Sequence, residues 1–268
     1  MSSATERRRN IVDLVRRQGF ASIEALAQQF RMTPQTIRRD INALCEQGTL
    51  RRYHGGAGLA GSSSTENLAY AERQVLCLQE KRRIARSVAQ HVPDHASLFI
   101  NIGTTNEEVA KALLGHQGLS IVTNNLNVAA TLARNDSFRV IVAGGLVRTR
   151  DHGIVGEATM DFIRQFKVDI GIIGISGIDA DGALLDFDYR EVRVAQTIIA
   201  NSRRVFLACD HTKFGRSAMV RLGSIEQIDE LFTDCPPAAA YRDLLTASEV
   251  VLNVASEAPP VEALARRA

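Results

Sequence analysis

The chain has 268 residues, of which 45% are hydrophobic, and a formal net charge of +2. This length and composition suffice for about two folded domains and exclude a chain that is disordered throughout. Residues 1 to 57 hold 10 basic and 5 acidic residues, whereas the remainder holds 22 basic and 25 acidic residues. The resulting charges of +5 and −3 predict a polyanionic partner for the N-terminal part alone.

Cysteine usage and hydropathy place the chain among cytoplasmic proteins. No stretch approaches the ~18 apolar residues of a membrane span, and the arginine-rich start has no following apolar segment of a secretion signal. The cysteines Cys45, Cys77, Cys209 and Cys235 are scattered in apolar contexts without paired spacing. They are therefore expected to be buried free thiols in a reducing compartment, with no metal site and no cofactor.

Three short helices are expected in the first 48 residues, from apolar residues at helical spacing. The first helix should end near Gly19, and the second should open after Ser22. The third should begin with Thr33 as N-cap and Pro34 in the first helical position, where its missing N–H costs nothing. This spacing matches a helix-turn-helix.

The third helix would present a polar face away from the face that carries Ile37, Ile41 and Leu44. The outward residues expected to contact DNA are Gln35, Thr36, Arg38, Arg39 and Asn42. Arginine and glutamine side chains offer paired hydrogen bonds to base edges in the major groove. Because a carboxylate repels phosphates, Asp40 is expected to orient a neighbouring arginine instead. The alternative is a plain three-helix bundle with a solvated polar face.

A hairpin is expected after Gly48, where a short strand runs into the glycine pair at 55 and 56. It would form a wing whose Arg51, Arg52 and His54 contact the DNA backbone or minor groove, which positions the protein without specifying sequence. The alternative is a structural hairpin with incidental charge. Residues 1 to 57 would thus be a winged helix-turn-helix domain.

The remaining boundaries follow from composition. Small polar residues suggest a flexible linker within residues 58–78, and an α/β domain for effector sensing and oligomerisation is expected over residues 79–256. Its first helix, from about Gln79 to Val92, carries basic residues expected to form a solvated face. They are Lys81, Arg82, Arg83 and Arg86. The proline- and alanine-rich residues 257–268 are expected to be a disordered tail.

From residue 97 onward, apolar runs alternate with helical stretches, which predicts a mainly parallel sheet covered by helices. The runs are 98–100, 121–122, 140–143, 170–173 and 205–208, and each ends in a polar or glycine-rich loop. In parallel sheets such loops converge on one edge, where ligands bind. Gly103 with Thr104 and Thr105 at a helix N-terminus, together with Lys213, indicates a phosphorylated metabolite there. Any single loop of this kind is more often a structural turn.

Other ligand classes find no support in the motifs. No glycine loop has the pattern of a dinucleotide or nucleotide phosphate site. The segment 179–182 begins like a calcium loop but lacks the closing glutamate, so a turn is expected there. His211 and Ser217 lie near each other without a nucleophile elbow, which argues against a hydrolase.

The chain resembles DeoR-type bacterial repressors in three segments, residues 22–27, 33–40 and 54–57. The resemblance implies a winged-helix repressor whose second domain is similar in fold to ribose-5-phosphate isomerases and CoA transferases. In that family the loops at the sheet edge hold a sugar phosphate or related effector. The matching residues are Asn101, Gly103, Thr104, Thr105, Thr123, Asn124, Gly144, Gly145, Asp210 and Lys213. Asn101 stands where the family usually has aspartate.

Five further segments resemble the branch of this family that controls glycerol-phosphate genes: 123–129, 156–159, 174–179, 186–189 and 210–216. The expected function is therefore a non-enzymatic repressor of glycerol-3-phosphate metabolism genes. It would bind double-stranded operator DNA as a homo-oligomer, a dimer or tetramer, and glycerol 3-phosphate would release it. Two alternatives remain: a repressor that responds to another sugar phosphate, and a phosphosugar isomerase-like enzyme with an appended DNA-binding domain.

Overall fold

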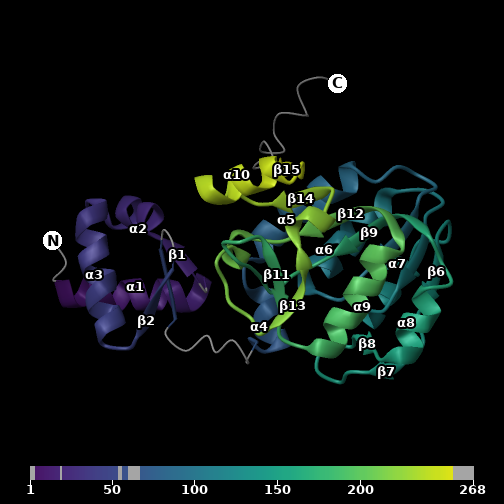
Figure 1. Ribbon diagram of the computed structural model, residues 1–268, viewed down its shortest axis with the longest axis horizontal. Helices are drawn as coiled ribbons and strands as arrows, with labels where there is room; N and C mark the ends of the chain where they lie inside the picture. The colour runs from purple at the N-terminus through teal and green to yellow at the C-terminus, as the bar shows by residue number, and fades with distance from the viewer. Residues whose placement is uncertain (1–3, 19, 54–55, 60–66, 256–268) are drawn as a thin grey trace.

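The computed structural model describes residues 4–18, 20–53, 56–59 and 67–255 (Figure 1). Their buried apolar side chains form one core cluster within residues 11–57 and two more within residues 84–250. No helix in these ranges is long and apolar enough to cross a membrane. The expected linker at 58–78 contains more regular structure than its composition suggested, since a strand reaches Leu59 and a helix spans Tyr70–Val75. The tail expected at 257–268 lies outside the described residues.

The N-terminal part consists of three helices and a three-stranded sheet. Its elements are α1 (Ala4–Gln18), β1 (Phe20–Ser22), α2 (Ile23–Phe30), α3 (Pro34–Glu46), β2 (Leu50–Tyr53) and β3 (Gly56–Leu59). Strands β2 and β3 pair in antiparallel fashion, with Tyr53 opposite Gly56, which confirms the expected hairpin. Strand β1, which the sequence did not reveal, pairs with the other side of β3.

Local hydrogen bonds explain where α2 and α3 begin. The side chain of Ser22 accepts a hydrogen bond from the Ala25 amide at 3.1 Å. Likewise the Thr33 hydroxyl accepts one from the Thr36 amide at 3.2 Å. Both expected helix starts are confirmed, and each capping side chain satisfies an amide that the first helical turn leaves without a partner. The turn between the two helices closes on Arg31, which has a φ of 51°.

A single core joins these elements, because each contributes at least one fully buried apolar side chain. Ile11 of α1, Leu26 of α2, Ile37 of α3, Leu50 of β2 and Ala57 of β3 all belong to it. Burial of large apolar side chains contributes roughly 1.5–3 kcal/mol each. The packing therefore fixes α3 against the other helices and holds its opposite face toward the surface.

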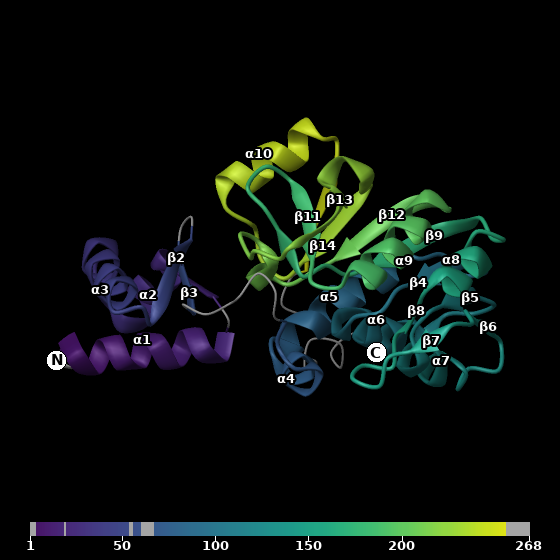
Figure 2. The same cartoon turned by 60° about the horizontal axis from the view of Figure 1, so that its bottom comes forward.

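The C-terminal part is built on a seven-stranded parallel sheet in the order β15-β14-β12-β9-β4-β5-β6 (Figures 1 and 2). Its strands are β4 (Ser97–Ile100), β5 (Ser120–Thr123), β6 (Arg139–Val142), β9 (Val168–Ile173), β12 (Ser202–Ala208), β14 (Glu230–Thr233) and β15 (Val251–Val254). The first five are the strands expected from the apolar runs, which confirms the mainly parallel α/β fold. β14 and β15 extend the sheet beyond them.

Helices cover both faces of this sheet. They are α5 (Leu78–Gln90), α6 (Thr104–Ala112), α7 (Leu126–Leu132), α8 (Glu157–Ile163), α9 (Tyr189–Ala200) and α10 (Ala239–Ala247). A further short helix, α4 (Tyr70–Val75), lies against α6 and has no buried residue. Successive residues of β4 enter different clusters, since Ile100 packs with α5 and α6 whereas Phe99 packs with α8 and α9. Two buried faces explain why the central strands are apolar throughout rather than alternating with polar residues.

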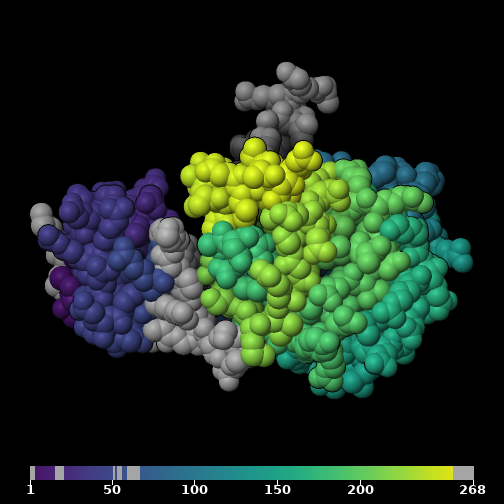
Figure 3. All heavy atoms as spheres, in the orientation of Figure 1, coloured from purple at the N-terminus to yellow at the C-terminus, as the bar shows by residue number. Residues whose placement is uncertain are grey.

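Short antiparallel strands complete the C-terminal part. They are β7 (Leu146–Val147), β8 (Ile154–Val155), β10 (Gly177–Ile178), β11 (Ala183–Asp186) and β13 (Val220–Ser224). The last three form a separate sheet that packs beside α10 (Figure 3). The calcium-like segment is the turn between β10 and β11, where the Gly182 amide donates to the Asp179 carbonyl at 3.1 Å and Gly182 has a φ of +83°. The expectation of a turn at residues 179–182 is thus confirmed.

Candidate DNA-binding and effector-binding sites

The outward face of α3 carries the polar side chains that the sequence assigned to DNA. Thr36 is partly buried, and the others are exposed: Gln35, Arg38, Arg39 and Asn42. The opposite face is occupied by buried Ile37, Ile41 and Leu44. A short helix with one buried side and hydrogen-bonding groups on the other has the form needed to lie in a major groove.

Asp40 lies on the buried side of α3, with 2% of its surface exposed. Its two carboxylate oxygens accept from the Nε atoms of Arg7, at 2.6 Å, and Arg8, at 2.9 Å. The expectation that Asp40 orients arginines is confirmed, although these arginines belong to α1 rather than to α3 itself. The pairs also fix α3 against α1 and remove part of the positive charge of the N-terminal part from the surface.

A side-chain hydrogen bond joins the wing to α3. The guanidinium of Arg52 in β2 donates from Nη1 to the Asn42 side-chain oxygen at 3.1 Å. Asn42 of α3 and Arg52 of the wing, both exposed, therefore lie side by side at the surface. The side chain of Arg51 and the whole of His54 lie outside the described part of the chain, so their roles stay predictions.

At the carboxyl edge of the parallel sheet, the loop after β4 leads directly into α6. Gly103 precedes this helix with a φ of +138°, a conformation that side chains with a Cβ rarely adopt. Thr104 and Thr105 form the first turn and are nearly buried. Asn106 donates from Nδ2 to the Asn101 carbonyl at 3.0 Å, which holds the loop in place. The start of α6 thus offers backbone amides and two hydroxyls to an anion.

Two of the expected side chains shape the neighbouring loops through internal hydrogen bonds. Thr123 donates its hydroxyl to the Ile100 carbonyl at 2.7 Å, and Asn124 donates from Nδ2 to the Ile154 carbonyl at 3.0 Å. The Asn124 side-chain oxygen is buried without a hydrogen-bond partner among the described residues. That oxygen can accept from a hydroxyl group, whereas Thr123 holds the loop itself.

Gly144 and Gly145 follow β6, at the outer edge of the sheet and four strands away from β12. At ~4.8 Å per strand this is about 19 Å from the loop that carries Asp210. The Thr159 hydroxyl donates to the Gly144 carbonyl at 2.8 Å, and a Cβ on Gly145 would lie 2.1 Å from that hydroxyl oxygen. Close packing thus accounts for Gly145. The glycine pair lies beside the loop after β5, which carries Thr123 and Asn124, but far from the loop after β12.

The loop after β12 brings a carboxylate and an ammonium group together. One oxygen of buried Asp210 accepts from the backbone amide and the hydroxyl of Thr212. Its other oxygen is buried without a hydrogen-bond partner among residues that the structure describes. Burial opposes ionisation of Asp210, but the nearby Lys213 ammonium and the Thr212 hydrogen bond hold its pKa below the usual value. The carboxylate is therefore charged and has an oxygen left to accept a hydroxyl.

Family models match both parts of the chain: the DeoR-like helix-turn-helix domain over residues 7–63 and the DeoR C terminal sensor domain over residues 77–235. The chain belongs to the DeoR family. Its N-terminal part is accordingly a DNA-binding domain, and its C-terminal part is the sensor domain of a DeoR-family regulator.

Curated relatives extend over nearly the full chain. The glycerol-3-phosphate regulon repressor of Escherichia coli (strain K12) is 53% identical over 250 residues, 93% of this chain and 98% of the relative. The repressor of the same name from Haemophilus influenzae is 52% identical over 86% of this chain and 89% of its own length. The transcriptional repressor CsqR of Escherichia coli is 42% identical over 91% and 93%.

Solved structures show a more distant likeness. Ribose 5 phosphate isomerase A from Neisseria gonorrhoeae matches with a TM-score of 0.37 and 16% identity, covering 50% of this chain and 52% of its own. The delta subunit of eIF2B from Chaetomium thermophilum matches with a TM-score of 0.46 and 15% identity, covering 59% and 57%. Neither likeness bears on the family assignment, which follows from the sequence matches.

The sensor domain of this DeoR-family chain contains a buried lysine that sequence patterns did not identify. Lys81 of α5 was expected on a solvated basic face, but only 3% of its surface is exposed, so that expectation was wrong for Lys81. Its ammonium group donates to the Arg73 carbonyl, and burial lowers its pKa to about 8 despite the opposing charge of Asp210. Lys213, whose pKa is also lowered by burial, faces the same carboxylate.

A second group of carboxylates lies near the guanidinium group of Arg73. Asp186, at the end of β11, accepts from the Ser176 hydroxyl at 3.0 Å, and burial raises its pKa. Burial also raises the pKa of Glu191 to about 8. Arg148 donates to Glu191 at 2.8 Å and to Asp151 at 2.7 Å. No short motif marks this network, because its members come from four separate segments that only the fold brings together.

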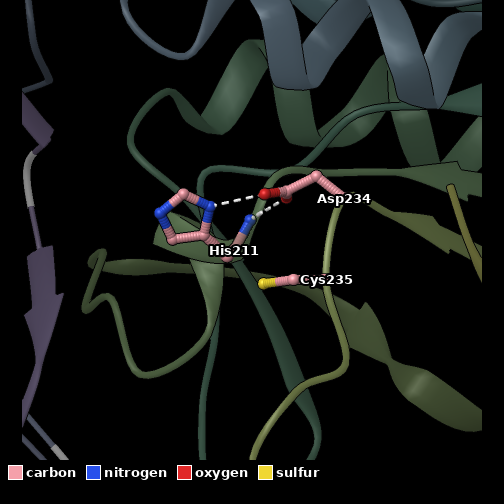
Figure 4. A group of neighbouring side chains, drawn as sticks. All are labelled: His211, Asp234 and Cys235. Atoms are coloured by element: carbon pink, nitrogen blue, oxygen red, sulfur yellow. Dashed lines mark hydrogen bonds and ion pairs between the residues drawn. The ribbon is translucent and has the colours of Figure 1, made fainter. Parts of the chain in front are cut away.

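His211, Asp234 and Cys235 form a compact group beside Asp210 (Figure 4). The backbone amide of His211 and its Nδ1 atom each lie 2.7 Å from an oxygen of Asp234. Both oxygens are therefore engaged in fixing the loop after β12. Cys235 is exposed, which makes the expectation of a buried thiol wrong for this residue. Partial burial of its sulfur and the charge of Asp234 nevertheless raise the pKa of Cys235 to about 11, so the thiol is protonated near neutral pH.

Proposed function

We propose that this protein is a DNA-binding repressor of glycerol-3-phosphate metabolism genes and that glycerol 3-phosphate releases it from operator DNA. The observation that carries the proposal is the 53% identity to a glycerol-3-phosphate regulon repressor across 93% of the chain. Because the match spans the DNA-binding and sensor domains together, it supports a regulator with both activities. The eight relatives we compared are named as repressors or regulators, which favours this function over an isomerase-like enzyme.

Operator recognition would fall to the exposed face of α3. Arg38 and Arg39 can each offer a two-pronged donor to guanine, and Gln35 can pair with adenine. Thr36 and Asn42 border the same face, and the wing residues Arg51, Arg52 and His54 would contact the phosphate backbone. Exposure of the α3 side chains and burial of Asp40 beneath them support this arrangement.

The effector would lie at the carboxyl edge of the parallel sheet. Its phosphate group would meet the amides and hydroxyls at Gly103, Thr104 and Thr105, with Lys213 and Lys81 supplying positive charge. Its hydroxyl groups would meet Asn101, Asn124 and Asp210, of which the last two have unpartnered buried oxygens among the described residues. Thr123, Gly144 and Gly145 would shape the surrounding loops.

Release would follow from different effector affinities of two arrangements of the protein. A homodimer or tetramer places two recognition helices on half-sites about one helical turn, or a multiple of it, apart. Effector binding would favour an arrangement with other spacing. A coupling free energy of ~1–3 kcal/mol between the two sites changes operator affinity about fivefold to 150-fold.

A titration of promoter fragments from the glycerol-phosphate genes of the host tests the proposal. Purified protein should bind one of these fragments more tightly than random duplex at moderate ionic strength, and glycerol 3-phosphate should weaken that binding. Ribose 5-phosphate serves as the comparison ligand. If it weakens binding and glycerol 3-phosphate does not, the repressor assignment stands and the inducer assignment fails.

Two variants separate the sites within this experiment. Arg39→Ala should weaken operator binding by ~1–3 kcal/mol and leave effector affinity unchanged. Lys213→Ala should bind operator normally but no longer respond to glycerol 3-phosphate, because the phosphate loses a charged partner. Arg203→Ala removes an exposed arginine of the sensor domain and is the matched control. Normal effector affinity of Lys213→Ala in calorimetry would refute the placement of the phosphate.

A further inference from the structure

Residues 67–75, which lie within the expected linker at 58–78, form a segment that we call the clasp segment. Only Asn67, Tyr70 and Arg73 in it are partly buried, and the others are exposed, including Val75 with 72% of its surface exposed. The segment therefore buries little apolar surface. Polar contacts must hold it against the sensor domain.

Tyr70 makes the first set of these contacts from α4, which lies beside α6 (Figure 2). Its hydroxyl lies 2.9 Å from both carboxylate oxygens of Glu107 on α6, and Glu107 is itself buried. Asn127 of α7 donates from Nδ2 to the same hydroxyl at 2.8 Å. The tyrosine hydroxyl is thus the junction between the clasp segment and two helices that begin at the carboxyl edge of the sheet.

A second set of contacts comes from the surroundings of the proposed effector site. Lys81, which faces Asp210, donates its ammonium group to the Arg73 carbonyl. Arg216 donates from Nη2 to the Asn67 side-chain oxygen at 2.8 Å. Arg73 pairs with Asp151 at 3.6 Å, but its Nε atom is buried without a hydrogen-bond partner among the described residues. These cations hold the clasp segment and border the site where a phosphate would bind.

We propose that the clasp segment transmits effector binding to the DNA-binding domain. In the closed form, the Tyr70 contacts hold the segment against the sensor domain, and the protein binds operator. Effector binding breaks these contacts and gives the open form. The inference rests on the proposed function, since it requires an effector at the sheet edge. A phosphate there competes with the Arg73 carbonyl for the Lys81 ammonium group and attracts the Arg73 guanidinium. The chain that leads to the DNA-binding domain then loses its fixed attachment.

Thermodynamic linkage predicts how operator affinity and effector affinity change when the clasp segment is weakened, and a purely structural contact would not give the same pattern. If the closed form binds operator and the open form binds effector, then weakening the clasp lowers operator affinity and raises effector affinity together. A variant that simply destabilises the fold weakens both. Opposite changes in the two affinities therefore identify a coupling element.

Tyr70→Phe tests the inference, because it removes the hydroxyl and keeps the ring. Without effector, operator affinity should fall on the order of fivefold, and glycerol 3-phosphate affinity in calorimetry should rise by up to the same factor. Tyr189→Phe, at a tyrosine with 64% of its surface exposed, is the matched control and should behave as wild type. Glu107→Gln replaces the accepting carboxylate by a neutral group of the same shape and should repeat the Tyr70→Phe result.

Hydrogen exchange of the wild-type protein gives an independent measurement. Amides of α4 should exchange faster when glycerol 3-phosphate is bound, whereas those of β9 in the sheet centre should not change. Unchanged operator affinity of Tyr70→Phe, or a parallel loss of both affinities, overturns the inference. Failure of the proposed function looks different: glycerol 3-phosphate then does not bind the wild-type protein, and operator affinity of Tyr70→Phe still reports whether the clasp acts.

Discussion

At the scale of single residues, Asp40 shows how a charge within a DNA-recognition helix serves the fold. It is the one acidic residue among the first turns of α3, and its carboxylate points into the N-terminal part and not toward the exposed arginines. The pairs with Arg7 and Arg8 balance its charge. A buried ion pair contributes little net stability relative to apolar packing, but loss of one partner leaves a buried charge uncompensated.

Asp40→Ala should therefore destabilise the N-terminal part strongly. The side chain of Arg7 is only 9% exposed, so its guanidinium would lose its partner in a poorly solvated place. We expect a loss of about 3 kcal/mol in the free energy of unfolding, measured by urea denaturation. Asp161→Ala breaks an ion pair whose side chains are 51% and 68% exposed, and it should cost less than about 1 kcal/mol. Equal effects of the two substitutions would contradict the structural role of Asp40.

At the scale of elements, the start of α3 depends on one hydroxyl. Thr33 caps the helix from outside its first turn, and its hydroxyl also lies 2.9 Å from that of Thr36. The capping bond fixes where the helix begins and hence which side chains its first turn presents. This element illustrates how a local sequence signal sets the orientation of a binding surface.

Thr33→Ala should lower the free energy of unfolding of the N-terminal part by about 1 kcal/mol, because the Thr36 amide loses its acceptor. Operator affinity should fall as well, since the first turn of α3 frays in the free protein. Thr33→Ser keeps the hydroxyl and should retain most of the stability. If the serine variant unfolds as readily as the alanine variant, the cap does not account for the loss.

Strong local signals made several elements predictable from sequence. The helix starts after Ser22 and at Thr33, the hairpin and five strands of the parallel sheet were found because each depends on neighbouring residues or on a run of apolar residues. Strand β14 was not predicted, because polar Glu230 and Thr233 at its ends leave an apolar run of only two residues, although all four of its residues are buried. Strand β1 was not predicted, because three residues are too few to show the alternation of apolar and polar side chains that marks a strand.

For the candidate sites too, features that depend on local sequence were predictable, and features that depend on contacts between distant segments were not. Exposure of the α3 face followed from helical spacing, but the burial of Lys81 did not, because its neighbours on α5 are exposed or partly exposed basic residues. Tyr70 and Arg73 were taken as linker, since only their contacts with Glu107 and Asp151 reveal that they are ordered against the sensor domain. Long-range pairing of this kind leaves no trace in local composition.

At the scale of the whole molecule, the two functions have separate hydrophobic cores. One cluster lies entirely within residues 11–57, and the other two lie within residues 84–250, with no member shared among the described residues. The charge divides in the same way, with the excess of basic residues before residue 58. Each domain can therefore be stabilised by its own ligand. Among the described residues, the polar contacts of the clasp segment are the contacts with the sensor domain that lie nearest in sequence to the DNA-binding domain.

Calorimetric unfolding should accordingly show two transitions with different ligand dependence. A ligand that binds only the native state stabilises its domain by about 2.7 kcal/mol at a concentration 100 times its dissociation constant. Glycerol 3-phosphate should thus raise the midpoint of the larger, sensor-domain transition, and a short operator duplex should raise that of the smaller one. If effector and operator oppose each other as we propose, adding both should give smaller shifts than each alone. Equal shifts of both transitions by either ligand would mean that the domains unfold as one unit.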